Sequence, residues 1–199
     1  MTVAKDRLKT QRMTLQEYLE YDDGTNTPYE LEDGILIEMT DEVAINKTIV
    51  TLLIVCFSQM GVSYRRMAAG HEIEVVSNYA TARKPDLIVH SEASESAIFD
   101  DTRLLRLGMP APALVVEVVS NSQKDKRSRD RDYVRKRQEY AERGIAEYWI
   151  IDPEAAVVLV LTLVEGVYQE KRFVDAEKLA SPMFPALELT ALQVLTANL

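Results

Sequence analysis

The sequence has little of what disulfide-linked, secreted or membrane-spanning proteins need. Its 199 residues include one cysteine, Cys56, which lies in an apolar run typical of an inert buried thiol. No apolar stretch approaches the roughly 20 residues of a membrane-spanning helix. The first residues, MTVAKDRLKTQRMT, contain no apolar core, which argues against a secretory signal. We therefore expect a cytoplasmic protein with no membrane partner.

Histidine and positive charge are also scarce. His71 and His90 are too few and too far apart in the sequence for a histidine-based metal site. The net charge of −9 argues against a surface coated with DNA-binding charge. One segment differs, because Lys124–Arg137 carries eight basic residues against three aspartates. It is either a solvated helix face or a patch that faces phosphates, and charge alone does not decide between them.

Hydrophobic spacing and turn residues predict a chain that mixes helices and strands. Two hairpins are expected, turning at Asp33-Gly34 and at Glu165-Gly166. Helices are expected at 14–23, at 42–60, at about 128–143 and after residue 190. Further strands are expected at 62–68, 71–77, 85–90, 114–120 and 146–152, with a long loop or partly helical excursion over 91–112. We predict a single α/β domain over residues 1–199, its core from about 14 to 195, with a mixed sheet flanked by helices.

Three carboxylates stand in strand contexts where apolar side chains are expected. Asp86 opens the strand PDLIV, Glu117 lies in LVVEVVS, and Glu30 lies in YELEDG. Carboxylates at the ends of adjacent strands can share a hard cation, Mg²⁺ or Mn²⁺ rather than Zn²⁺, which can orient a water for attack on a phosphodiester. Each residue also has a simpler interpretation. Asp86 fits a strand-start cap, Glu117 a salt bridge and Glu30 a solvent-facing hairpin edge.

Several blocks of the sequence carry a resemblance to nucleases. Pro85-Asp86 followed by the strand Glu117–Val119 resembles the two-part signature of the PD-(D/E)XK nuclease superfamily. More closely, five blocks in order resemble a bacterial family of restriction endonuclease-like proteins. These are YELEDGILIEM, RKPDLIV, LVVEVVS, RDRDYVRKRQEY and GIAEYWIIDP. The similarity extends from about Thr14 to Leu195, nearly the whole chain.

The resemblance implies a fold and a set of site residues. The fold is a restriction-endonuclease-like core, a mixed sheet with helices on both sides. Asp86 and Glu117 are implied as metal ligands, with the backbone carbonyl of Val118 as the third. Glu30 matches the acidic residue that the superfamily often contributes from an earlier element, near the metal.

The superfamily pattern expects a lysine two residues after the glutamate, where this chain has Val119. Because strand side chains alternate, residue 119 shares the side of Glu117, and a lysine there would stand beside the metal. The following helix offers Lys136 as a substitute, and the resemblance points to a lysine on this same helix. Lys84, just before the proline, is a competing donor.

Helical spacing gives Lys136 a second interpretation. Asp132, Lys136 and Tyr140 lie at i, i+4 and i+8 and share one helical stripe. That spacing also fits an ordinary surface ion pair between Asp132 and Lys136. The sequence leaves both interpretations open.

The predicted function is that of a Mg²⁺- or Mn²⁺-dependent endonuclease that hydrolyses DNA phosphodiester bonds. Lys136 and Glu30 are its expected catalytic residues. A homodimer is expected by analogy, because cutting a duplex needs two sites. The alternative is a nuclease fold without catalysis, acting as a nucleic-acid-binding or regulatory module. The missing motif lysine and the negative net charge favour that alternative, whereas the carboxylate trio favours the enzyme.

Overall fold

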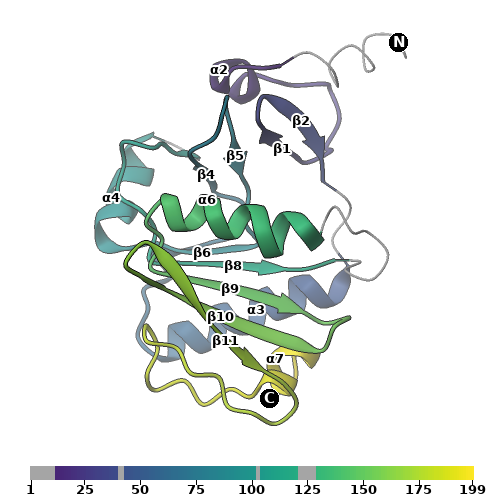
Figure 1. Ribbon diagram of the computed structural model, residues 1–199, viewed down its shortest axis with the longest axis vertical. Helices are drawn as coiled ribbons and strands as arrows, with labels where there is room; N and C mark the ends of the chain where they lie inside the picture. Colours follow the sequence, from purple (N-terminus) through teal and green to yellow (C-terminus); the bar gives the residue numbers. More distant parts are fainter. Residues whose placement is uncertain (1–11, 40–42, 102–103, 121–128) are drawn as a thin grey trace.

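The computed structural model describes residues 12–39, 43–101, 104–120 and 129–199. In these ranges the chain forms two β-sheets with helices packed around them (Figure 1). The helices are α2 (Leu15–Leu19), α3 (Ala44–Gln59), α4 (Glu92–Asp101), α6 (Lys136–Glu142) and α7 (Ala191–Thr196), with a 3₁₀ turn η1 (Tyr64–Arg66) and a π-helical segment η2 (Arg131–Arg135). No helix in the described ranges is long and apolar enough to span a membrane.

Both sheets are mixed. The smaller has the order β2-β1-β5-β4-β7 and the larger the order β11-β10-β9-β8-β6-β3. Strands of the smaller sheet are β1 (Tyr29–Glu32), β2 (Ile35–Glu38), β4 (Glu72–Glu74), β5 (Ala82–Arg83) and β7 (Leu104–Leu105). Strands of the larger are β3 (Met67–Ala68), β6 (Leu87–Val89), β8 (Leu114–Val118), β9 (Glu147–Asp152), β10 (Val157–Val164) and β11 (Val167–Phe173). The predicted fold class is confirmed, with two mixed sheets instead of one; the single-domain organisation stays a prediction.

The chain crosses from one sheet to the other at Lys84-Pro85. β5 ends at Arg83 in the smaller sheet, and β6 begins at Leu87 in the larger. Proline has no amide hydrogen to give to a sheet ladder, so one continuous strand through this point is disfavoured. The crossing leaves Asp86 at the start of β6.

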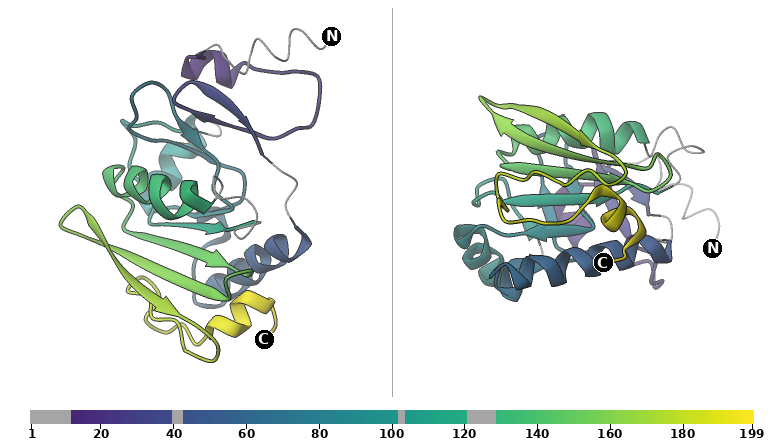
Figure 2. Two further views of the ribbon diagram at one scale, coloured as in Figure 1. Left: turned by 45° about the vertical axis from the view of Figure 1, so that its right-hand side comes forward. Right: turned by 90° about the horizontal axis from the view of Figure 1, so that it is seen from below.

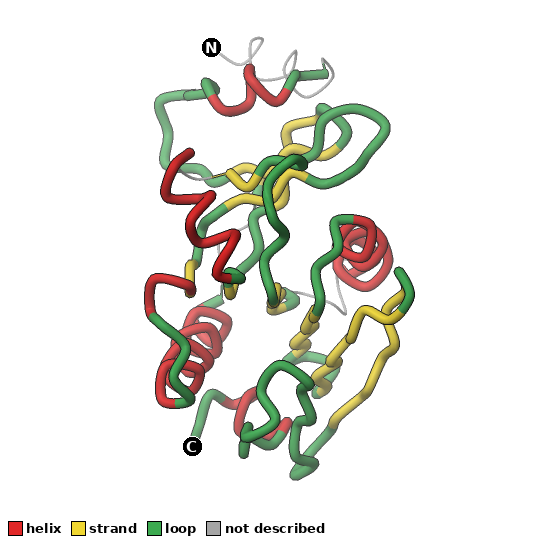
Figure 3. The backbone as a smooth tube through the Cα atoms, turned by 90° about the vertical axis from the view of Figure 1, so that its left-hand side faces the viewer, coloured by secondary structure: helices red, strands yellow, loops and turns green. Residues whose placement is uncertain are grey.

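Helices α3 and α6 cover opposite faces of the larger sheet (Figures 2 and 3). Val116 and Val118 of β8 belong to the apolar cluster that includes the buried side of α3. Val115 and Val119 belong to the cluster on the other face, together with Tyr140 of α6. Since strand side chains alternate, Glu117 lies on the α6 face.

Local sequence signals account for most of the predicted elements. The two hairpins turn where predicted, and their turn residues Asp33, Gly34, Glu165 and Gly166 all have positive φ, as a type I′ turn requires. Helix α3 closely matches the prediction and is followed by Gly61, whose φ is +90°. The predicted helix over 128–143 is present as η2 and α6, while residues 121–128 lie outside the described ranges.

Two predictions need correction. The strand predicted at 62–68 is shorter, because the hydroxyl of Ser63 accepts a hydrogen bond from Arg65 N (3.3 Å) and caps the 3₁₀ turn η1, which leaves only β3. Helix α2, which begins at the expected capping box of Thr14 and Glu17, ends at Leu19 rather than Asp23. The excursion at 91–112 is partly helical as expected, since it contains α4 and β7.

The α3 face of the core gives a direct test of the packing. Phe57 is 0% exposed; its ring stacks on Phe184 (4.2 Å between centroids) and meets Trp149 edge-on at 5.7 Å. We expect Phe57→Ala to lower the free energy of unfolding by about 3–5 kcal/mol, measured by urea denaturation. Phe99→Ala is the matched control, because Phe99 is 57% exposed and should cost about 1 kcal/mol or less. Similar losses for the two variants would contradict this packing.

Candidate active site

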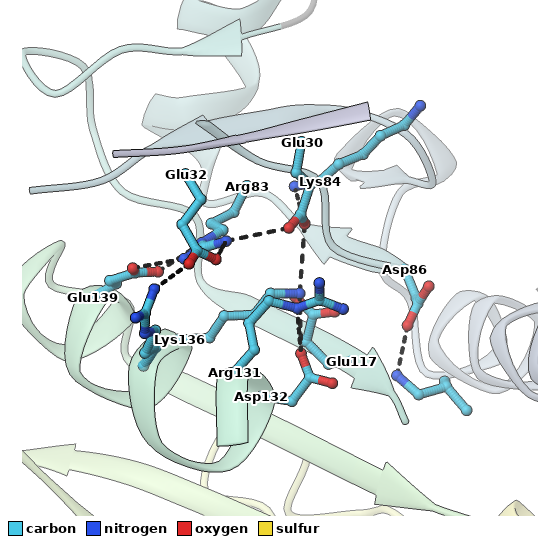
Figure 4. Close-up of polar contacts among 12 residues, drawn as sticks. Glu30, Glu32, Arg83, Lys84, Asp86, Glu117, Arg131, Asp132, Lys136 and Glu139 are labelled. Atoms are coloured by element: carbon cyan, nitrogen blue, oxygen red, sulfur yellow. Dashed lines mark hydrogen bonds and ion pairs between the residues drawn. The ribbon is translucent and has the colours of Figure 1, made fainter. Parts of the chain in front are cut away.

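A buried lysine joins carboxylates from three elements beneath α6 (Figure 4). Lys136 Nζ lies 2.8 Å from Glu117 Oε1 of β8, 3.2 Å from Asp132 Oδ1 of η2 and 3.5 Å from Glu30 Oε1 of β1. Lys136 is 2% exposed, Glu117 5% and Glu30 1%. An uncompensated charge at such depth is costly, so the cation and the carboxylates stabilise one another.

The π-helical segment η2 immediately precedes this lysine. The backbone N–H of Lys136 donates to the carbonyl of Arg131, five residues earlier, as in a π-helix. Single π-turns inside helices are frequent at functional sites. One turn further along, the hydroxyl of Tyr140 donates to Glu117 Oε1 over 2.8 Å. Two donors from one helix thus converge on one oxygen of Glu117.

A second buried cation ties the smaller sheet to α6. Arg83 is 0% exposed and lies between Glu30 (3.3 Å) and Glu32 (2.9 Å) of β1. Its Nε and Nη2 also donate to the two carboxylate oxygens of Glu139 over 2.7 and 2.8 Å. The bidentate pair with Glu139 holds β5 against α6. The backbone N–H of Lys84 donates to Glu30 Oε1 (2.9 Å) and completes the environment of that carboxylate.

The charges of this cluster shift each other's protonation. Burial raises the pKa of Glu117; the Lys136 ammonium opposes this rise, and Asp132 and Glu30 reinforce it. Burial alone would also raise the pKa of Glu30, but the Lys136 and Arg83 cations outweigh it and hold that pKa well below its usual range. Burial would lower the pKa of Lys136, but the three carboxylates raise it, so the ammonium stays protonated at neutral pH.

Asp86 lies at the end of the neighbouring strand. β6 pairs antiparallel with β8, with Leu87 opposite Val116, so one further step of the register brings Asp86 opposite Glu117. Its Oδ2 accepts a hydrogen bond from Val118 N at 2.6 Å. The carbonyl of Val118 accepts from Asn46 Nδ2 of α3 at 3.1 Å.

The structure brings Glu30, Glu117 and Lys136 into contact, places Asp86 opposite Glu117 by strand register, and separates the two candidate lysines. Lys136 points into the carboxylate cluster, whereas the side chain of Lys84 points away from it (Figure 4). The solvent-facing interpretation of Glu30 is wrong. Glu30 is 1% exposed, and its carboxylate contacts Arg83 of β5 and Lys136 of α6. Asp132 and Lys136 do pair, but in the interior instead of on the surface. Glu117 does form the salt bridge offered as its alternative. The catalytic and metal-binding roles of these residues stay predictions.

Sequence reasoning missed part of the cluster. Tyr140 lies four residues after Lys136, and this helical spacing places it on the same stripe. No role is predicted for it from the sequence, but in the structure it binds Glu117. Nothing in the sequence indicates that Arg83 is buried, because an arginine in the polar stretch ARKPD resembles a surface residue. The histidines, distant in sequence, lie in contact, with His71 Nδ1 3.0 Å from His90 Nε2. The sequence distance between them was therefore a poor guide to their spatial distance.

The donor set can be tested against a divalent cation. Among the described residues, no group of three or more histidine, cysteine, aspartate or glutamate side chains is arranged to hold a metal. The predicted set does not require such a group, because it consists of two carboxylates, Asp86 and Glu117, and the carbonyl of Val118. All are hard oxygen donors, which suits Mg²⁺ or Mn²⁺. The contacts between Val118 N and Asp86 and between Val118 O and Asn46 keep these donors at neighbouring strand ends.

Comparison with known proteins agrees with the fold. A model of the Uma2 family, described as "Putative restriction endonuclease", matches residues 15–193. The chain is also similar to the crystal structure of a putative nuclease belonging to DUF820 from Anabaena variabilis ATCC 29413. That similarity has a TM-score of 0.67 and 18% sequence identity, over 92% of this chain and 97% of the other, and it shows the fold. No curated protein matches the chain. The family resemblance predicted from the sequence is confirmed.

Removing the buried cation should reveal how much the cluster depends on it. We expect Lys136→Met to lower the free energy of unfolding by about 3–5 kcal/mol near neutral pH, because Glu117, Asp132 and Glu30 each lose an ion pair, although Glu30 keeps its pair with Arg83. The pKa values of Glu117 and Glu30 then rise in the folded state, because the Lys136 cation no longer lowers them. A carboxyl whose pKa is raised by folding stabilises the folded state at low pH, and this contribution disappears as the pH increases. The decrease in unfolding free energy caused by Lys136→Met should therefore be larger at about pH 8 than at about pH 5. Urea denaturation at both pH values measures it.

Lys178→Met is the control for this experiment. Lys178 forms an exposed ion pair with Glu188, which should contribute about 1 kcal/mol or less. A Lys136→Met loss that is as small as the control, or that does not change with pH, would contradict the buried network.

Proposed function

We propose, from the premise that this chain belongs to the Uma2 family of putative restriction endonucleases, that it is a metal-dependent endonuclease which hydrolyses DNA phosphodiester bonds. The observation that carries the proposal is the contact of 2.8 Å between Lys136 and Glu117 inside the fold. It supports Lys136 as the substitute for the lysine that Val119 replaces in the superfamily pattern.

Asp86, Glu117 and the backbone carbonyl of Val118 would hold Mg²⁺ or Mn²⁺. When bound, such a cation supplies Lewis acidity and lowers the pKa of a water so that it can attack phosphorus. The two carboxylates lie opposite each other by register, where the strands β6 and β8 pair.

Lys136 would supply positive charge beside the reacting phosphate. Its ammonium is protonated at neutral pH, so it can donate hydrogen bonds to the attacking water or to the phosphate oxygens that gain charge. Glu30 would hold the ammonium in place, and Tyr140 would fix one oxygen of Glu117. Because Lys136 is held by three carboxylates, little rearrangement is needed during the reaction.

A dimer would let the enzyme cut both strands of a duplex. This follows from the need for two sites and not from an interface. Light scattering with size-exclusion chromatography measures the mass directly. A mass of one chain at working concentration would leave an enzyme that nicks one strand at a time.

Plasmid cleavage is the direct test of the proposed activity. We expect the wild type to nick supercoiled DNA in Mg²⁺ or Mn²⁺ and not in EDTA. Glu117→Gln should lower the rate by about a hundredfold or more, because a neutral amide cannot serve as an anionic metal ligand. Glu170→Gln, at an exposed position on β11, should cut like the wild type. Equal activity in all three preparations would point to a contaminant and would refute the assignment.

Calorimetry separates metal binding from catalysis. Titration of the wild type with Mn²⁺ should give a saturable heat, and Asp86→Asn should remove it while leaving the circular dichroism spectrum unchanged. Lys136→Met is expected to keep metal binding but lose cleavage. DNA binding with no metal heat and no cutting on many substrates would favour the non-catalytic binding module instead.

A further inference from the structure

A cavity of ≈ 590 Å³ lies beside Asp86. Its walls come from the two ends of the β1–β2 hairpin, from α3 and from the crossing between the two sheets. The Lys84 side chain, which points away from the carboxylate cluster in Figure 4, lines this cavity instead. The cavity therefore shares Asp86 with the candidate active site.

The lining has two chemically different parts. Pro28, Met39, Val50 and Ile54 present apolar surface, contributed by the hairpin ends and by α3. The positively charged residues Lys47 and Lys84 also line the cavity, one from α3 and the other two residues before Asp86. An apolar wall with a few placed polar groups is typical of a ligand pocket.

The size and the charge limit what fits. Pockets of about 300–1,000 Å³ enclose one small molecule, whereas a base-paired duplex is bound on an open surface or in a wide groove. An apolar wall suits the face of a base, and lysines suit a phosphate. A single nucleotide unit combines both features at this scale.

We propose that this cavity binds an unpaired nucleotide of the DNA strand, with the base against the apolar wall and a phosphate near Lys47 and Lys84. The inference rests on the proposed function, because it takes DNA as the substrate. It goes further in naming the form of DNA. A strand with an unpaired end should bind better than a continuous duplex, because taking a base out of a stack costs a few kcal/mol.

Fluorescence anisotropy with two labelled DNA hairpins tests the proposal. One hairpin has a single-stranded overhang and the other has a blunt end, with the same duplex in both. Binding is measured in EDTA, so that no cutting interferes. We expect the wild type to bind the overhang hairpin about tenfold more tightly than the blunt one. Equal affinities, or no binding to either hairpin, would overturn the proposal.

Lysine variants test the phosphate contact. Lys84→Ala and Lys47→Ala should each weaken overhang binding about three- to tenfold and reduce the salt slope by about 0.7. Lys171→Ala, at an exposed position on β11, should leave both unchanged. Equal losses for the overhang and the blunt hairpin would mean that the two lysines contact any DNA, which also overturns the pocket assignment.

A charge-matched pair of variants on α3 tests the location. Thr51 lines the cavity and is exposed, while Ser58 is exposed seven residues further along the same helix, about 10 Å away. Thr51→Glu should weaken overhang binding about tenfold, because a carboxylate there would repel the phosphate. Ser58→Glu adds the same charge outside the cavity and should change binding less than about twofold. Equal effects would contradict the site.

The same assays show whether the bound nucleotide is free or part of a DNA strand. They also separate a failure of the pocket proposal from a failure of the nuclease proposal. Displacement of the overhang hairpin by a free deoxynucleoside monophosphate as readily as by a short single strand would make this a free-nucleotide site and overturn the proposal. A wild type that cuts plasmid but binds both hairpins equally refutes only the pocket. A wild type that shows the overhang preference and its lysine dependence but never cuts with metal supports the pocket and refutes the nuclease assignment.

Discussion

The attraction between Lys136 and the carboxylates of Glu30, Glu117 and Asp132 is the interaction on which the candidate site depends. Each carboxylate comes from a different element, and each would be costly to bury alone. One cation among them removes most of that cost and sets the distance between the smaller sheet, the larger sheet and the helix that lies between them. The same contacts place an ammonium group beside the strand ends where a metal is proposed to bind.

Arg83 is a second buried cation that pairs with carboxylates, at the point where the chain passes between the two sheets. The chain passes from β5 to β6 through Pro85, where no ladder hydrogen bond can continue. Ion pairs hold the chain at this break instead of ladder hydrogen bonds, because Arg83 binds carboxylates of both β1 and α6. The break in the sheet also lets Lys84 leave the cluster and face the cavity beside Asp86. One short segment thus supplies a structural cation, a proposed ligand of the metal and a proposed contact to DNA.

Prediction from the sequence succeeded where the evidence was local. The hairpin turns, the glycine after α3 and the burial of β8 follow from turn chemistry and from hydrophobic pattern, and the structure has them. Helical spacing, the missing lysine at Val119 and the family resemblance all pointed to the helix of Lys136, which the structure places beside Glu117, while its catalytic role stays a prediction. The short 3₁₀ turn before β3 and the second sheet were not found, because they depend on a single capping hydroxyl and on which strands pair at long range.

The sequence by itself determined the order of the elements, the strand that carries Glu117 and the helix that carries its cation, because these depend on neighbours along the chain. Only the tertiary structure decided that Glu30 is buried, that Arg83 bridges three carboxylates and that His71 touches His90. A charged residue on a short strand has the same local signature whether solvent or another element covers it. Burial is decided by the packing of α6 across both sheets, and no stretch of sequence around Glu30 or Arg83 records that packing.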